Sequence, residues 1–226
     1  MYSILLSKID VSFNIIKDEV KKLVHENMRV AILPWTFPFE IDSNQLVNEY
    51  FKENDKRYNK YVNPLIDLGI KKEAITICDC YKHSKEELKK IINNSDILVL
   101  PGGNPEMFFS KVVHETELLY NIKYFKGLII GESAGCELHL KRYFITEKNN
   151  YYDYFAFYDG FGIIDDTFYM DVHSMDDLDY SKKLQEIANE KKRIVYAIFD
   201  DGAIIYNRDV KECKLFGRVD KYLPLY

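Results

Sequence analysis

The 226-residue sequence has few cysteines and no long apolar run. Its four cysteines, Cys78, Cys80, Cys136 and Cys213, are too few for the disulfide framework of a small secreted domain. Cys78 and Cys80 form C-x-C, one residue short of the spacing typical of redox and zinc motifs, so we expect ordinary thiols in a reducing compartment and no metal site. No stretch approaches about 18 uncharged apolar residues, which excludes a membrane-spanning helix.

The sequence also lacks an excess of positive charge. It has 31 Lys+Arg against 36 Asp+Glu, a net charge of −5, and a pI of about 5.6. Nucleic-acid-binding proteins usually show a basic excess, and the short lysine runs here are typical of solvated faces, so we expect no nucleic-acid partner. The first residues contain neither a positively charged region nor a small-residue cleavage site, which favours a cytoplasmic protein without membrane contact.

Apolar residues, by contrast, are abundant enough for a buried core. Hydrophobic residues make up 47% of the chain and aromatic residues 15%, which excludes a disordered protein. The length and the absence of a repeat or linker favour a single domain over residues 1–226, as a monomer or a homodimer.

Strand-like and helix-like segments alternate in the first half of the chain. Apolar strands that alternate with helices predict an α/β fold with a mostly parallel central sheet and helices on both faces. Ligands of such sheets bind at the carboxyl ends of the strands, here the loops after Ser7, Leu100 and Ile130. The predicted strands are 2–7, 29–35, 74–80, 96–100 and 127–130, and the predicted helices include 42–67, opened by Asp42 or Ser43, and 84–93, opened by a Ser84 capping box.

The second half is less regular. Residues 142–172 alternate aromatic and polar side chains, with turns at Asn149-Asn150 and Asp159-Gly160, which indicates hairpins or short strands. A helix is predicted at 176–190, followed by strands at 194–199 and 203–206.

The most specific local signal is Gly131-Glu132-Ser133-Ala134-Gly135, which follows a buried strand and precedes a predicted helix at 136–140. G-x-S-x-G in this context is typical of a nucleophile elbow. Its glycines are needed because a Cβ at either position would collide with the neighbouring strand and helix. The pattern predicts Ser133 as a nucleophile and leaves the amide of Ala134 free to face an oxyanion.

A glycine pair follows another strand at the same sheet edge, in Pro101-Gly102-Gly103-Asn104. Such a pair lets the backbone approach a ligand closely, and its amides could complete an oxyanion hole, although the same residues are also typical of an ordinary turn. Gly102 and Asn104 are candidate substrate-binding residues.

A serine nucleophile needs a base, and His173 is the favoured histidine. It closes the predicted strand at 167–172 and precedes a helix start, which places it at the catalytic edge; a structural histidine is the alternative. His139 points away from Ser133 by its helical spacing, and the other histidines, His25, His83 and His114, lie in surface or connecting segments.

The order of these features resembles the peptidase E and cyanophycinase family of serine peptidases over nearly the whole chain. The resemblance implies a flavodoxin-like three-layer sandwich similar to class I glutamine amidotransferases, with serine as the nucleophile, and hydrolysis of dipeptides or short peptides. It also implies His173 as the general base and the amides of Gly103 and Ala134 as oxyanion donors. The segments that carry it are Leu5-Leu6-Ser7, Gly102-Gly103-Asn104, the elbow, Gly160-Phe161-Gly162-Ile163-Ile164 and Asp171-Val172-His173, which is similar to the Asp-Gln-His of cyanophycinases.

The residues do not determine which carboxylate is the third member of a catalytic triad. In peptidase E the acid follows the serine by about fifteen residues; the counted position here is Lys148, so the nearest carboxylate, Glu147, is the expected acid and Asp201 the alternative. Asp171 is a further candidate substrate-binding residue. Where the family holds a substrate aspartate with an arginine, this chain offers only lysines such as Lys182 and Lys183, so aspartate preference is not predicted.

Two other functions compete with a peptidase. A small-molecule serine esterase with the α/β-hydrolase elbow usually places its histidine near the C-terminus, and no histidine follows His173. A non-catalytic binding or sensor protein on the same fold is suggested by the uncertain acid and the missing arginine. We expect a short peptide as the partner and neither a cofactor nor a metal.

Overall fold

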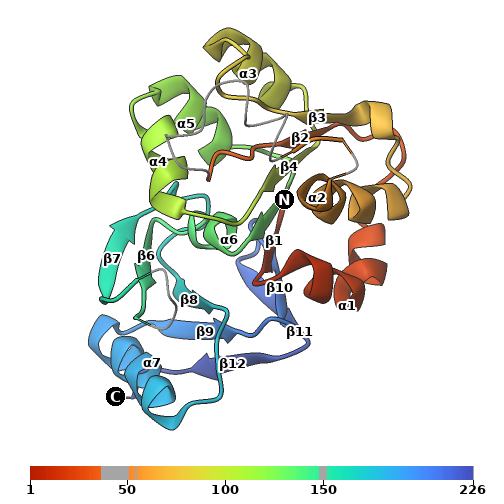
Figure 1. Ribbon diagram of the computed structural model, residues 1–226. Helices are drawn as coiled ribbons and strands as arrows, with labels where there is room; N and C mark the ends of the chain where they lie inside the picture. The colour runs from red at the N-terminus through yellow and green to blue at the C-terminus, as the bar shows by residue number, and fades with distance from the viewer. Residues whose placement is uncertain (37–50, 54, 148–151, 226) are drawn as a thin grey trace.

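The computed structural model describes residues 1–36, 51–53, 55–147 and 152–225. A seven-stranded sheet forms the centre of this described part (Figure 1), built from β1 (Tyr2–Leu6), β2 (Val30–Ile32), β3 (Ile75–Ile77), β4 (Ile97–Leu100), β5 (Leu128–Glu132), β10 (Ala203–Asn207) and β11 (Glu212–Phe216). Its strand order is β11-β10-β1-β5-β4-β2-β3. The five strands from β1 to β3 are parallel, whereas β10 pairs antiparallel with β1 and with β11. The predicted mostly parallel sheet is confirmed.

Helices cover both faces of this sheet, as predicted. Alternate residues of a strand point to opposite faces. On β1, Ile4 and Leu6 belong to the apolar core beneath α1 (Ile9–Lys21) and α2 (Lys56–Asp67), and Leu5 belongs to the core on the opposite face. That opposite face is covered by α3 (Lys85–Asn93), α4 (Pro105–Val113) and α5 (Thr116–Lys123).

A smaller three-stranded sheet lies beside the main one. It has the order β12-β9-β8, in which β8 (Phe168–Val172) and β9 (Ile194–Ile198) are parallel and β12 (Val219–Tyr222) is antiparallel to β9. α7 (Leu178–Lys191) packs on this sheet, and the hairpin of β6 (Arg142–Ile145) and β7 (Ala156–Asp159) lies next to it (Figure 1).

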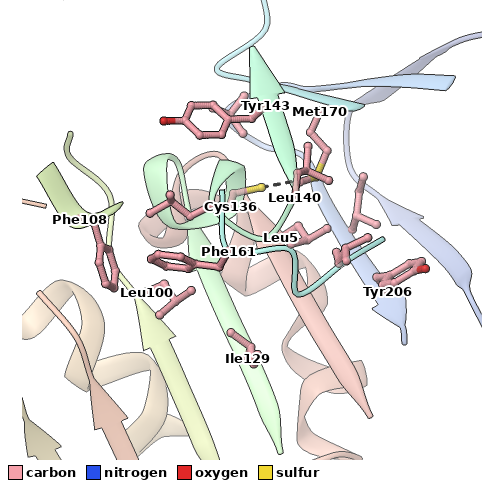
Figure 2. Close-up of a cluster of buried hydrophobic side chains, with 14 of the residues drawn as sticks. Leu5, Leu100, Phe108, Ile129, Cys136, Leu140, Tyr143, Phe161, Met170 and Tyr206 are labelled. Atoms are coloured by element: carbon pink, nitrogen blue, oxygen red, sulfur yellow. Dashed lines mark hydrogen bonds between the residues drawn. The ribbon is translucent and has the colours of Figure 1, made fainter. Parts of the chain in front are cut away.

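One continuous apolar cluster joins the two sheets (Figure 2). Leu5 and Ile129 come from the main sheet, and Met170 comes from β8 of the small one. Cys136, just after the predicted nucleophile, places its sulfur 3.7 Å from that of Met170. The turn that carries Ser133 is therefore packed between both sheets.

The main differences from the predicted elements concern the start of one helix and two strands that were not predicted. The predicted helix at 42–67 is confirmed over Lys56–Asp67, but its described residues before Lys56 are not helical, because α2 begins at Lys56 and Asp55 caps it by accepting from the Lys56 amide at 2.6 Å. Asp42, Ser43 and the Asn149-Asn150 turn lie outside the described residues. β11 and β12 were not predicted because most of their side chains are exposed or half-exposed, which removes the apolar run that marks a buried strand.

The Ser84 capping box at the start of α3 is confirmed, with both reciprocal hydrogen bonds present. None of the helices in the described residues combines the length and the hydrophobicity that a membrane span requires.

Candidate active site

Ser133 lies in a sharp turn between β5 and the short helix α6 (Ala134–Glu137). Its φ of 49° and ψ of −114° are rare for a non-glycine residue, and such strain is concentrated at functional sites. The Ser133 amide donates to the Leu6 carbonyl at 2.8 Å, which anchors the turn to β1. The strand–turn–helix context expected of a nucleophile elbow is therefore present.

Two glycines flank this turn because neighbouring backbone leaves no room for a side chain. A Cβ on Gly135 would lie 1.9 Å from the Leu100 carbonyl oxygen. A Cβ on Gly131 would lie 2.6 Å from both the Gly135 carbonyl oxygen and Cε1 of His139. The close packing of β4, β5 and α6 is thus possible only with glycine at both positions.

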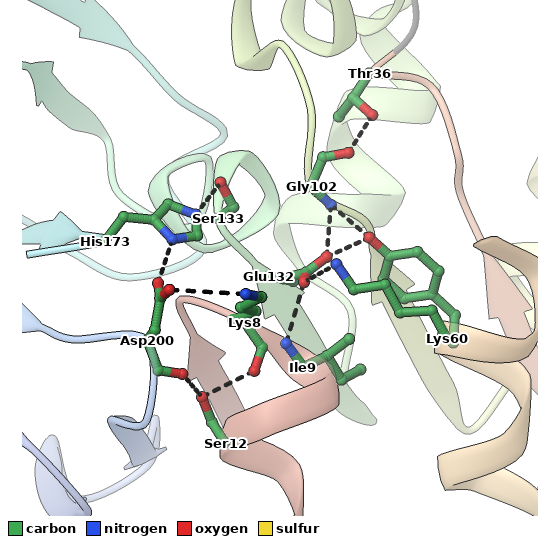
Figure 3. A network of polar contacts seen from close by, with 11 residues as sticks. Lys8, Ile9, Ser12, Thr36, Lys60, Gly102, Glu132, Ser133, His173 and Asp200 are labelled. Atoms are coloured by element: carbon green, nitrogen blue, oxygen red, sulfur yellow. Dashed lines mark hydrogen bonds and ion pairs between the residues drawn. The ribbon is translucent and has the colours of Figure 1, made fainter. Parts of the chain in front are cut away.

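His173 follows β8 and faces Ser133 (Figure 3). Its Nε2 lies 3.0 Å from the Ser133 Oγ. Its backbone also has a positive φ, 54°, and its amide donates to the Ser7 hydroxyl at 2.9 Å, while that hydroxyl donates to the Ile198 carbonyl at 2.7 Å. Ser7, which follows β1, thus joins the ends of β8 and β9 to the main sheet.

The carboxylate beside His173 belongs to Asp200, which was not predicted. Oδ1 of Asp200 lies 2.7 Å from Nδ1 of His173 (Figure 3). A carboxylate accepts hydrogen bonds, so Nδ1 carries the proton and Nε2 is left to accept from the serine hydroxyl. Lys8 lies 3.8 Å from the other Asp200 oxygen, and Ser12 donates to the Asp200 carbonyl at 2.8 Å.

Glu147, the expected acid, is elsewhere. Its carboxylate accepts from Lys183 of α7 at 2.6 Å. Asp201, the alternative, is one residue beyond the carboxylate that meets His173. Lys182 pairs with Asp179 at 2.8 Å, so both lysines considered for substrate binding are engaged in ion pairs.

The signal that identifies Asp200 is the pairing of two strands. β8 and β9 are parallel neighbours with Val172 opposite Ile198, so the residues just after them lie side by side. Both strands were predicted from their apolar residues, but their pairing was not. Glu147 was predicted from its distance along the chain from Ser133. That distance does not indicate which strands lie side by side.

Gly102 lies against the nucleophile, and Gly103 is the next residue of the same loop. A Cβ on Gly102 would lie 3.2 Å from the Cβ of Ser133. The Gly102 amide donates to the Tyr61 hydroxyl at 3.1 Å and to Glu132 Oε2 at 3.3 Å. It is therefore not available to bind a substrate, contrary to the prediction. Ala134 is the first residue of α6, where an amide has no partner within the helix.

Two other predicted substrate-binding residues have structural contacts instead. The Asn104 side chain accepts from the Met107 amide at 3.0 Å and caps α4. Asp171 is buried on β8 and accepts a hydrogen bond from the Tyr180 hydroxyl of α7, so its carboxylate is enclosed by protein.

An arginine that was not predicted joins the loops that carry His173 and Asp200. The Arg218 guanidinium forms two hydrogen bonds with the Asp176 carboxylate, in the loop after His173. It also lies 3.8 Å from the ring centre of Phe199, the residue before Asp200. The guanidinium thereby links the loop after His173 to the residue that precedes Asp200.

The four cysteines are free thiols. Cys136 is fully buried, and burial raises its pKa well above the usual value, so it remains a neutral thiol below the elbow. In the part of the chain that the structure describes, no group of three or more His, Cys, Asp or Glu side chains could hold a metal ion.

His139 lies buried beneath the elbow, with Nδ1 2.7 Å from the Gly135 carbonyl oxygen. Burial lowers its pKa from 6.5 to about 3. Between pH 6.5 and about pH 3, His139 is therefore protonated in the unfolded chain but neutral in the folded protein. As the pH falls below 6.5, protonation of the unfolded chain lowers the free energy of unfolding, and above pH 6.5 this loss is absent.

We expect the free energy of unfolding to fall by about 1.4 kcal/mol for each pH unit below 6.5, or by about 2 kcal/mol at pH 5. Urea unfolding of wild type and His139→Gln at pH 7 and pH 5 tests it, because glutamine removes the titration. The variant should lose less stability than wild type between the two pH values. Equal losses in the two proteins would refute the role of His139.

A protein-family comparison covers the part of the chain that carries this site. The model of Peptidase family S51 matches residues 51–213, more than half of the chain. The chain belongs to Peptidase family S51. The resemblance predicted from the sequence motifs is confirmed, and the matched region of this S51 peptidase contains Ser133, His173 and Asp200. No curated protein matches it significantly.

Two solved structures share the fold of this S51 peptidase. One is a protein from Listeria monocytogenes EGD-e described as a "putative peptidase E", with a TM-score of 0.59 and 17% identity over 98% of each chain. The other is a peptidase from an acI-B1 actinobacterium, with a TM-score of 0.66 and 13% identity over 99% of this chain and 94% of that one. At such identities the likeness shows the fold alone, and the fold prediction is confirmed.

Proposed function

We propose that this S51 peptidase hydrolyses dipeptides or short peptides through an acyl-enzyme on Ser133. The proposal rests on one observation, the contact chain from Ser133 Oγ through His173 to Asp200, with distances of 3.0 and 2.7 Å. Serine hydrolases on unrelated folds use the same sequence of nucleophile, imidazole and carboxylate. Membership of a serine peptidase family supports a peptide bond as the target.

In the first half of the reaction, Ser133 Oγ attacks the peptide carbonyl carbon while His173 Nε2 takes the hydroxyl proton. Asp200 holds Nδ1–H and stabilises the imidazolium that forms. The amides of Gly103 and Ala134 donate to the oxyanion. His173 then returns the proton to the leaving amine, the C–N bond breaks, and an ester on Ser133 remains.

In the second half, water replaces the amine. His173 takes a proton from the water as its oxygen attacks the ester carbonyl, and the same two amides stabilise the second oxyanion. Collapse of this intermediate returns the proton to Ser133 Oγ and releases the carboxylic acid product.

A fluorophosphonate probe tests the nucleophile directly. We expect folded wild type to be labelled on Ser133 and Ser133→Ala to remain unlabelled. A panel of dipeptides should then be cleaved by wild type, with product amines as the readout. Nitrophenyl esters in the same assay separate an esterase, which would turn over esters but no dipeptide.

A protein that neither reacts with the probe nor cleaves any dipeptide or ester would contradict the enzymatic proposal. That result would support a binding or sensor protein on the same fold. Circular dichroism of each sample confirms that an inactive protein is folded.

A further inference from the structure

Two buried polar side chains hold the Gly102–Gly103 loop from opposite sides (Figure 3). Glu132 is the last residue of β5, immediately before Ser133, and Thr36 lies in the segment that follows β2. Each side chain belongs to a residue that is only 2% exposed. Neither is part of the Ser133–His173–Asp200 contact chain, so the fold must use them in another way.

Glu132 collects hydrogen-bond donors from three other segments. Its Oε1 accepts from the Ile9 amide of α1 at 3.0 Å and lies 2.5 Å from Nζ of Lys60 on α2. Its Oε2 accepts from the Tyr61 hydroxyl and, at 3.3 Å, from the Gly102 amide. The residue that precedes the nucleophile therefore fixes α1, α2 and the glycine loop at once.

Burial of the Glu132 carboxylate is energetically unfavourable for a contact with only a structural role. Burying a carboxylate carries a desolvation penalty, and an apolar residue of similar size would fill the same volume without it. Burial, with Glu132 adding to it, raises the pKa of Tyr61 well above the usual value, so the phenol keeps its proton and donates to Glu132. What the carboxylate supplies is a defined position for the Gly102 amide.

Thr36 holds the next peptide bond of the same loop. Its hydroxyl donates to the Gly102 carbonyl at 2.7 Å, and its own carbonyl accepts from the Asn104 amide at 3.1 Å. Gly103 has a φ of 138°, and a Cβ there would lie 2.5 Å from the Thr36 hydroxyl oxygen, so only glycine allows this contact.

The Thr36 hydrogen bond sets the direction of the Gly103 amide. In a trans peptide the carbonyl of one residue and the N–H of the next point in opposite directions. Because Thr36 holds the Gly102 carbonyl oxygen on one side, the Gly103 N–H is directed to the other side. Glu132 holds the preceding amide, so the whole peptide plane cannot rotate freely.

We propose that Glu132 and Thr36 are positioning residues that orient the Gly102–Gly103 peptide so that the Gly103 N–H meets the oxyanion. This inference rests on the proposed function and extends it to two residues that touch neither the substrate nor the reacting atoms. They act through the glycine loop, so their removal weakens binding of the transition state more than binding of the substrate.

Thr36→Val tests the hydroxyl with almost no change in side-chain volume. We expect kcat to fall by about 10–100-fold while KM stays within about 3-fold, less than the loss when an oxyanion donor is deleted outright. Thr36→Ser keeps the hydroxyl and should retain kcat close to that of wild type. A dipeptide aldehyde, whose adduct with Ser133 places an oxygen in the oxyanion hole, should bind Thr36→Val more weakly in proportion to the loss in kcat.

Glu132→Gln tests the carboxylate. Glutamine has one acceptor oxygen, so its NH₂ group must face either the Ile9 and Lys60 donors or the Tyr61 and Gly102 donors. We expect the same pattern of lower kcat and weaker aldehyde binding with little change in KM. If this variant does not fold, the Thr36 pair decides the question alone.

Ser84→Ala is the matched control, because it removes a capping hydroxyl of α3. It should lower the urea midpoint and leave kcat unchanged. Wild-type kcat and aldehyde affinity in Thr36→Val would overturn the positioning role while the peptidase proposal stands. Similar changes in kcat and KM would identify a merely structural role, and a wild type without activity would overturn both proposals.

Discussion

Replacing Ser133 with alanine is expected to lower kcat by about a millionfold, the loss typical of a deleted serine nucleophile. Among the described residues, the neighbouring Cys136 thiol is not a substitute nucleophile. Cys136 is buried inside the turn, and its pKa is raised by that burial. The residual rate would come from the oxyanion hole and substrate binding, which act without the nucleophile.

Single-turnover hydrolysis of the best dipeptide measures this loss. Because a trace of wild type or of a contaminating serine protease would dominate the residual rate, the Ser133→Ala sample alone is first treated with the fluorophosphonate, and the excess probe is removed. Ser84→Ala serves as the control and should retain full activity. Activity of Ser133→Ala within about 100-fold of wild type, after that treatment, would contradict a covalent mechanism on this residue.

Replacing Asp200 with asparagine is expected to lower kcat by about 10²–10⁴-fold. In Ser-His-Asp enzymes the loss from this change approaches 10⁴, because the imidazole adopts the wrong tautomer and its cation is no longer stabilised. The Asp200 side chain is 54% exposed, so water can partly replace its hydrogen bond to His173 and keep the loss below that limit. KM should change little, since Asp200 acts through His173.

Two variants that each remove one carboxylate provide the controls. Asp201→Asn changes the adjacent residue, and Glu147→Gln changes the carboxylate paired with Lys183. Both should keep kcat/KM within about 2-fold of wild type, as is usual for changes outside the catalytic contacts. A greater loss in either control than in Asp200→Asn would show that the acid is not the residue beside His173.

Local patterns were sufficient to predict the nucleophile and the general layout of the sheet. The elbow around Ser133 is defined by neighbours in sequence, so its glycines and flanking apolar strand can be recognised directly. His173 could be placed because a residue that closes a parallel strand reaches the ligand-binding edge.

The acid and the positioning residues depend on contacts that no local pattern reports. Asp200 reaches His173 only because β9 lies next to β8, and sheet order does not follow from apolar runs. Glu132 lies within the recognised motif, yet its partners come from α1, α2 and the glycine loop. Thr36 precedes no recognisable motif and is identified only by its contact with Gly102.

The arrangement of β1 has a consequence for the order in which activity arises during synthesis. β1 lies between β5 and β10, so one edge of this strand is paired only after the much later β10 has been made. Such distant pairings fold slowly, and a growing chain emerges N-terminal end first. A chain still on the ribosome can hold Ser133 before His173 and Asp200 exist, and Ser7 has no Ile198 carbonyl to bind until β9 is made. The proposed peptidase activity can therefore arise only after the segment that carries Asp200 has been translated.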